Sequence, residues 1–172
     1  MDLEKIIFQL DYTTNEILNF INTTTEAERN FKKQENWNIP EILEHVYLTD
    51  QIIFSIISKP SSTISTQTEI VGNDKIREGL MDKRKEQKIL APEFLLPKGE
   101  FKEMTILTEV FINEREAFKI ALKKGEVLVD NRVHKHPKIG DMTIVDWLNF
   151  MIHHTQRHIE QMKDNLSDFR AK

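Results

Sequence analysis

The chain has 172 residues, no cysteine and a formal net charge of −4. The absence of thiols excludes disulfides, thiolate metal sites and a cysteine nucleophile. The acidic balance argues against nucleic-acid binding, which needs a basic surface facing the phosphates. With 39% apolar and 30% charged residues, the composition is typical of a soluble globular protein, and the length predicts a single domain over residues 1–172.

The first ten residues, MDLEKIIFQL, do not have the basic start and apolar block of a signal peptide. No part of the sequence approaches the roughly 18 consecutive apolar residues of a membrane-spanning helix. We therefore expect a cytoplasmic protein that does not bind membranes.

The first predicted helix covers residues 3–21, because apolar side chains recur there at intervals of three and four. Threonines 23–25 are β-branched and end this helix. Thr25 and Glu28 have the spacing of a capping box, which predicts a short helical turn after it. The residues that follow this period in the first helix are Leu3, Ile6, Ile7, Leu10, Thr14, Ile17, Leu18 and Ile21.

A second helix is predicted to follow Asn38, the expected N-cap, with Pro40 in its first turn and Glu41 completing a capping box. Pro60 ends it. His45 lies early in this helix, at the flank of the apolar stripe. The stripe itself consists of Ile42, Val46, Thr49, Ile53, Ile56 and Ile57.

The middle of the chain is less regular. Residues 61–72 are polar and rich in hydroxyl groups, and we interpret them as a loop. Residues 73–89 can form a third, mostly solvated helix, while residues 91–99 (APEFLLPKG) are bracketed by prolines and a glycine and are expected to be irregular. Basic residues crowd the solvated helix, forming either an ordinary solvated face or a patch that attracts an anionic substrate; they are Arg77, Lys83, Arg84, Lys85 and Lys88.

Another long helix is predicted over residues 102–123, and Glu114 and Arg115 lie beside its apolar stripe. Either residue can form a structural ion pair across the core or line a polar pocket. Residues 125–142 form a long connection with turns. Within it, we expect His136 to be structural or to line the mouth of a pocket, and His134 to be exposed.

The last helix, predicted over residues 143–165, carries the most informative pattern, and Thr143 and Asp146 form its capping box. His154 and His158 lie within its apolar stripe, four residues apart, so that they stack on one face. Two imidazoles in this arrangement can share a tetrahedral metal ion. The alternative explanation is a pair of core histidines that hydrogen-bond to carbonyl groups.

A metal site of this kind needs a third ligand, for which His45 is the candidate. His153 points about 100° away from His154, so we place it at a flank or in solvent and exclude it as a ligand. Trp147 and Met151 share the face of the histidine pair and are expected in the core rather than in contact with substrate.

Four long helices, an extra short helix and long crossover loops predict an all-α fold, a four-helix bundle. A di-iron bundle is disfavoured, because Glu41 and Glu44 precede His45 but no Glu-x-x-His motif accompanies His154.

The sequence resembles the DinB-like (DinB/YfiT) superfamily of metalloenzymes in segments that cover most of the chain. The most specific segment is 136–162, with its His-Pro turn, capped helix, histidine pair and following Gln161. Weaker matches are residues 37–46 (WNIPEILEHV), residues 91–99 and the Glu114-Arg115 pair.

This resemblance implies a bundle with up–down–down–up connectivity and a metal triad of His45, His154 and His158. It further implies a thiol-dependent S-transferase acting on small electrophilic substrates, with a divalent metal ion and a low-molecular-weight thiol as co-substrate. Three imidazoles leave a fourth position open, and zinc and nickel both suit nitrogen ligands. The partner for the outer nitrogen of each imidazole can be Gln161, Glu114 or a backbone carbonyl.

Two other functions remain open. One is a metal-dependent hydrolase, and the other is a non-catalytic bundle that acts as a binding or stress-response interaction module. A site closed by side chains would favour the interaction module. We also expect a homodimer, because symmetric dimers are the commonest oligomers.

Overall fold

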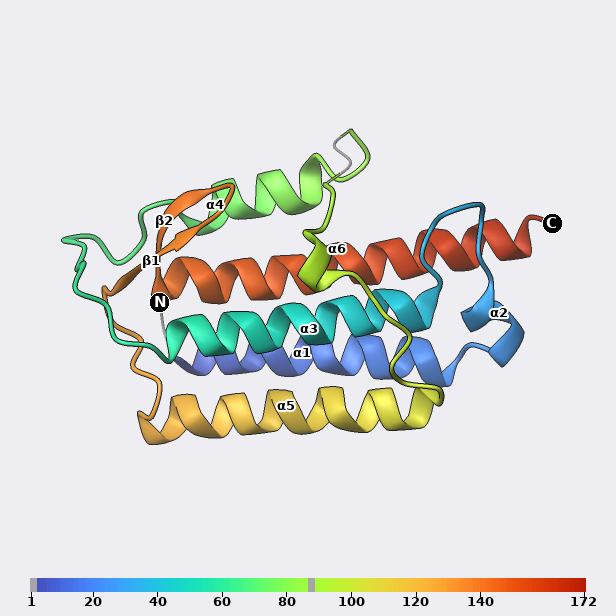
Figure 1. Ribbon diagram of the computed structural model, residues 1–172, viewed down its shortest axis with the longest axis horizontal. Helices are drawn as coiled ribbons and strands as arrows, with labels where there is room; N and C mark the ends of the chain where they lie inside the picture. Colours follow the sequence, from blue (N-terminus) through green and yellow to red (C-terminus); the bar gives the residue numbers. More distant parts are fainter. Residues whose placement is uncertain (1–2, 87–88) are drawn as a thin grey trace.

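The structure, a computed structural model, describes residues 3–86 and 89–172 and is mostly helical, with one small two-stranded sheet (Figure 1). Its long helices lie side by side; α1 and α6 run in one direction, and α3 and α5 run in the opposite one (Figure 1). These helices are α1 (Leu3–Asn22), α3 (Ile39–Ile57), α5 (Met104–Lys124) and α6 (Ile144–Arg170).

Each long helix buries its apolar stripe against two neighbours: α1 and α3 both contact α5 and α6. Two apolar clusters fill the space between them. One surrounds Ile6, Ile53 and Trp147, and the other surrounds Leu43 and Met162. Between the two clusters along the helices lie buried polar residues, namely Thr13, His45, Thr49, Asp50, Arg115, His154, Thr155 and His158.

All three predicted capping boxes are confirmed, at the starts of α2 (Glu26–Asn30), α3 and α6. The box of α6 also fixes the loop before it. Asp146 accepts hydrogen bonds from the backbone N–H groups of residues 70–72, at 2.8–3.2 Å, and the Thr143 hydroxyl donates to the Thr68 carbonyl. The loop over residues 61–72 is thereby docked on the start of α6.

The predicted helix over residues 73–89 is wrong in its length. It consists of α4 (Asn73–Arg77) and a π-helical turn, η1 (Glu78–Asp82). Ile76 and Leu80 are buried, whereas Ile89 is 44% exposed. Residues 82–88 are all polar or charged, so a longer helix would have no apolar face to bury. Residues 87 and 88, and with them Lys88, lie outside the described residues.

The connection after α5 contains a β-hairpin that the sequence analysis did not predict. Strands β1 (Val133–His136) and β2 (Gly140–Thr143) pair antiparallel, with Val133 opposite Thr143. Gly140 has φ 95°, a backbone conformation that favours glycine at the turn. The expected irregular segment 91–99 contains only a short 3₁₀ turn, η2 (Glu93–Leu95). None of the described helices combines the length and apolarity needed to cross a membrane.

Candidate metal centre

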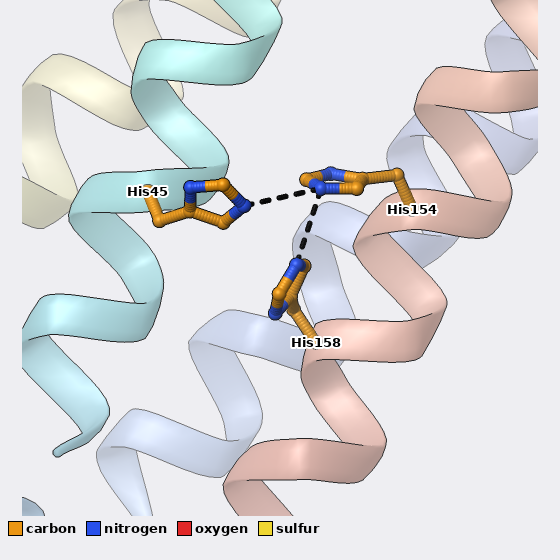
Figure 2. A group of neighbouring side chains, drawn as sticks. All are labelled: His45, His154 and His158. Carbon is orange, nitrogen blue, oxygen red and sulfur yellow. Dashed lines mark hydrogen bonds between the residues drawn. The ribbon is translucent and has the colours of Figure 1, made fainter. Parts of the chain in front are cut away.

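Three histidines from two helices converge in the core. His45 comes from α3, and His154 and His158 come from successive turns of α6 (Figure 2). The Nε2 atom of His154 lies 3.2 Å from Nε2 of His45 and 3.1 Å from Nε2 of His158. The three side chains are nearly covered, with 4%, 8% and 7% of their surface exposed in chain order.

Aromatic rings enclose this histidine cluster. Phe150, one turn before His154, stacks on its imidazole with ring centres 5.5 Å apart and an interplanar angle of 15°. Trp37 lies 4.9 Å from the His45 ring. These contacts limit the rotation of the imidazoles and keep water away from them, so interactions between charged or polar groups are stronger there than in bulk water.

The outer nitrogens of two histidines have acceptor partners. Nδ1 of His45 lies 2.8 Å from the Leu95 carbonyl oxygen. A carbonyl only accepts, so this nitrogen carries the hydrogen, and Nε2 of a neutral His45 keeps its lone pair. Nδ1 of His158 donates in the same way to Oε1 of Gln161, at 2.8 Å. Of the expected partners, a backbone carbonyl and Gln161 are therefore used.

The third histidine differs from the other two. Nδ1 of His154 is buried and has no hydrogen-bond partner among the described residues. Its Nε2 atom faces two other Nε2 atoms and can donate a hydrogen to only one of them at a time. Part of the hydrogen-bonding capacity of the cluster is therefore left unused by the protein itself.

All three imidazoles are held in the neutral form. Burial lowers the pKa of His45, lowers the pKa of His154 well below its usual value and lowers the pKa of His158 to about 3. The neighbouring histidines lower the pKa values of His154 and His158 further. A neutral imidazole is the form that ligates metal ions.

The arrangement fits a divalent cation. Nitrogen ligands about 2.05 Å from a tetrahedral ion lie about 3.3 Å from one another, close to the two Nε2–Nε2 separations of 3.1 and 3.2 Å in the structure. One nitrogen from each of the three rings lies within 4.8 Å of the other two. Three imidazoles suit zinc, nickel and copper rather than magnesium or calcium.

A second buried polar cluster surrounds Arg115, which is 2% exposed. Nε and Nη2 of Arg115 contact Oδ2 of Asp50 at 2.8 Å. Nη1 donates to Thr13 and Thr14, and Nη2 donates to Thr155. Arg115 thus forms a structural ion pair across the core, which was one of the two predicted roles, the other being to line a polar pocket. Its partner, Asp50, was not predicted.

Of the two places expected for His153, a flank or solvent, the solvent one is wrong, and the exposure expected for His134 is wrong as well. His153 is not in solvent: it is 6% exposed and hydrogen-bonds through its two ring nitrogens to Gln156 and Asn73. It does stay outside the cluster of three. His134 is half-buried rather than exposed, and burial lowers its pKa. The buried face of α6 is wider than the predicted apolar stripe, because α4 covers the side of the helix that carries His153.

His136 has the expected structural role in the turn after β1. Its Nδ1 atom accepts hydrogen bonds from the backbone N–H groups of Lys138 and Ile139, at 3.2 and 3.1 Å. Its ring lies 5.3 Å from Trp147 and 5.1 Å from Phe150. The side chain therefore joins the hairpin turn to the aromatic residues beside the histidine cluster.

The basic residues around α4 are largely paired with acidic neighbours. Lys83 contacts Glu78 at 2.7 Å, and Arg84 contacts Asp164 at 2.6 Å. This pairing favours the interpretation as a solvated face over that of an anion-attracting patch.

A mostly helical fold with three converging core histidines defines the class of protein, and comparison with known families agrees. The family model of the DinB superfamily matches residues 9–162, so the chain belongs to this superfamily. The chain is also similar to the uncharacterized protein YuaE of Bacillus subtilis (strain 168), with 27% identity over 130 residues that cover 76% of this chain and 77% of YuaE. No solved structure gives a significant match.

Proposed function

We propose that the protein binds one divalent metal ion, zinc or nickel, through His45, His154 and His158. The observation that carries this proposal is the convergence of three neutral imidazoles whose Nε2 atoms lie 3.1 and 3.2 Å apart. Within the described parts of the chain, no single hydrogen-bond donor satisfies all three atoms. Buried polar groups without partners are costly, so such an arrangement favours a ligand.

A bound divalent ion at an open position would lower the pKa of a thiol there, which makes the thiolate available near neutral pH. Two of the histidine side chains are oriented for such an ion before it binds. His45 and His158 direct their lone pairs inward because their outer nitrogens donate to Leu95 and Gln161. The aromatic rings of Trp37 and Phe150 enclose the imidazoles and limit the access of water.

We further propose that the activity is a thiol-dependent S-transfer to a small electrophile, as membership of the DinB superfamily and the lack of cysteine in the chain support. The sulfur of the incoming thiol forms a bond to the electrophilic carbon, the leaving group departs with the bonding electron pair, and the thiol proton goes to solvent. The reactive sulfur thus arrives with the substrate rather than from the chain.

The test loads the protein with zinc or nickel and measures the consumption of a thiol, with cysteine as the first probe, by a chloronitrobenzene electrophile. We expect consumption above the uncatalysed rate, and its loss after treatment with a chelator. The matched control is the His154→Leu variant under the same conditions. Equal rates for the parent and the variant across a panel of thiols would contradict the transferase proposal.

A non-catalytic interaction module is the second candidate, and one observation favours it. None of the three histidines is more than 8% exposed, so a substrate reaches them only if neighbouring residues move. Stoichiometric metal binding without consumption of any thiol would support this alternative, and hydrolysis of esters or amides by the metal-loaded protein would support a hydrolase.

Several broader features belong to the same proposal. We describe the fold as a four-helix bundle with up–down–down–up connectivity, forming one domain over residues 1–172; the helix directions support this description (Figure 1). We also propose a cytoplasmic homodimer with a small-molecule substrate. Size-exclusion chromatography with light scattering tests the dimer.

A further inference from the structure

Glu44, the residue before His45, has an unusual environment for an acidic side chain. It is 3% exposed. Its carboxylate accepts hydrogen bonds from three consecutive backbone N–H groups, those of Lys98 and Gly99 at 3.0 Å and that of Glu100 at 3.4 Å. Gly99 has φ 68°, and a left-handed residue within such a run lets successive N–H groups form a concave anion site.

The segment that Glu44 holds is also the one that contacts His45. Only Leu96 and Pro97 separate Leu95, whose carbonyl accepts from Nδ1 of His45, from the N–H groups on Glu44. The ring of Pro97 fixes one of the backbone angles in this short link. On the other side, the 3₁₀ turn η2 is closed by hydrogen bonds from Leu95 and Leu96 to residues 92 and 93.

We propose that Glu44 is a positioning residue for His45. By holding residues 98–100, its carboxylate fixes the Leu95 carbonyl, and that carbonyl fixes both the tautomer and the direction of the His45 imidazole. As far as metal affinity is concerned, this inference rests on the proposed function. The ordering of His45 itself does not, since it is a property of the metal-free protein.

Glu44 and His45, which are neighbours on α3, thus both form hydrogen bonds to the segment 95–100. The acceptor for Nδ1 of His45 is the carbonyl of Leu95, at the end of the three-residue turn η2, in a segment with almost no other regular structure. Such a segment needs an anchor, because the motion of a free loop would break the hydrogen bond between Nδ1 of His45 and the Leu95 carbonyl. The anchor is a buried carboxylate with three donors, and hydrogen bonds to charged groups are stronger than those between neutral groups.

The experiment compares the parent with Glu44→Gln, which keeps the shape of the side chain but removes its charge. Proton and nitrogen NMR of the metal-free protein follows the Nδ1–H signals of His45 and His158. We expect the His45 signal to broaden or exchange faster in the variant. The His158 signal should be unchanged, because Gln161 on the same helix holds that imidazole, and general unfolding would affect both signals.

Competition with a chromophoric chelator then measures zinc affinity. Loss of an outer partner of a metal-bound histidine reduces affinity about 10- to 100-fold, and we expect a loss in this range for Glu44→Gln. Gly99→Ala, which strains the left-handed backbone without touching the carboxylate, should shift both readouts in the same direction. Glu93→Gln, on the exposed side of η2, carries the same charge change and should shift neither.

The outcomes separate the two proposals. A parent that takes up no zinc overturns the proposed metal site, and the His45 NMR signal still decides whether Glu44 positions the ring. An unchanged His45 signal in folded Glu44→Gln overturns the positioning role. If the His45 signal is disturbed but the zinc affinity equals that of the parent, the importance of Glu44 for the metal site is overturned. If Glu44→Gln does not fold, the Gly99→Ala variant decides by the same two measurements.

Discussion

The two buried polar clusters of this protein differ in how their polar groups are paired. Around Arg115, the guanidinium donates to Asp50 and to the hydroxyls of Thr13, Thr14 and Thr155. Around His154, three Nε2 atoms face one another, and Nδ1 of His154 has no partner among the described residues. In the first cluster Arg115 and Asp50 compensate each other's charge, although Oδ1 of Asp50 has no hydrogen-bond partner among the described residues. In the second, no cation or acidic group faces the three Nε2 atoms among the described contacts, and we propose a metal ion as their ligand.

The first prediction tests the structural side of this comparison and has the largest expected effect. Arg115→Ala leaves the Asp50 carboxylate buried without its cation, which should lower the free energy of unfolding by about 3–5 kcal/mol. Urea denaturation of chelator-treated protein measures it. Replacing both partners, with Arg115→Met and Asp50→Leu, should recover most of the loss. A loss below about 1 kcal/mol for the single variant would show that the ion pair is not structural.

The second prediction concerns the histidine cluster. Zinc at a thousandfold excess over its dissociation constant should raise the free energy of unfolding of the parent by about 4 kcal/mol. His154→Leu removes a buried polar group that lacks one partner, so its metal-free stability should stay within about 1 kcal/mol of the parent. Its stabilisation by zinc should disappear. Equal stabilisation of both proteins would place the zinc elsewhere.

The third prediction is a pH dependence of the metal-free protein. The unfolded chain binds a proton at each histidine near pH 6.5, whereas burial lowers the pKa of folded His158 to about 3. The unfolded state therefore binds more protons between these values. Stability from this group is fully present above about pH 6.5 and falls by about 1.4 kcal/mol per pH unit as the pH drops toward 3.

The control for this pH dependence is His158→Leu. Its free energy of unfolding should fall less steeply with decreasing pH, because one fewer proton is taken up on unfolding, which corresponds to about 1.4 kcal/mol per pH unit. Unfolding curves at several pH values, recorded in the presence of chelator, give both slopes. Identical slopes for the two proteins would mean that the imidazole of His158 is not held neutral by burial.

The fourth prediction has the smallest effect. Gln161→Ala removes the acceptor for Nδ1 of His158 but leaves the imidazole in place. Zinc affinity should fall about tenfold, with little change around Arg115 and therefore little change in metal-free stability. A chelator competition assay and urea denaturation measure the two quantities. Unchanged affinity would mean that helix packing alone orients His158.

The sequence predicted those parts of the site that depend on local spacing. His154 and His158 are one helical turn apart, and the capping boxes at Asn38 and Thr143 lie within three residues of their partners, so each pattern is visible in one stretch of chain. The convergence of His45 with them was inferred from its place on a second helix and from the resemblance to the DinB-like superfamily.

Other parts of the site had no local signal. The acceptor for His45 is the backbone carbonyl of Leu95, which any residue could supply, and the partner of Arg115 is Asp50, 65 positions earlier. The burial of His153 depends on α4, whose position is set by tertiary packing. The hairpin over residues 133–143 was missed because each of its strands has only four residues and lacks a clear alternation.

The measurement that tests the central claim most directly is the metal content of the protein, purified without a histidine tag or chelator, beside that of His158→Ala. Mass spectrometry of the digested samples gives the metal bound per chain. We predict close to one zinc or nickel ion per chain in the parent and a large loss in the variant. A metal-free parent that also fails to take up zinc or nickel on titration would contradict the account, and the three histidines would then be polar residues of the core.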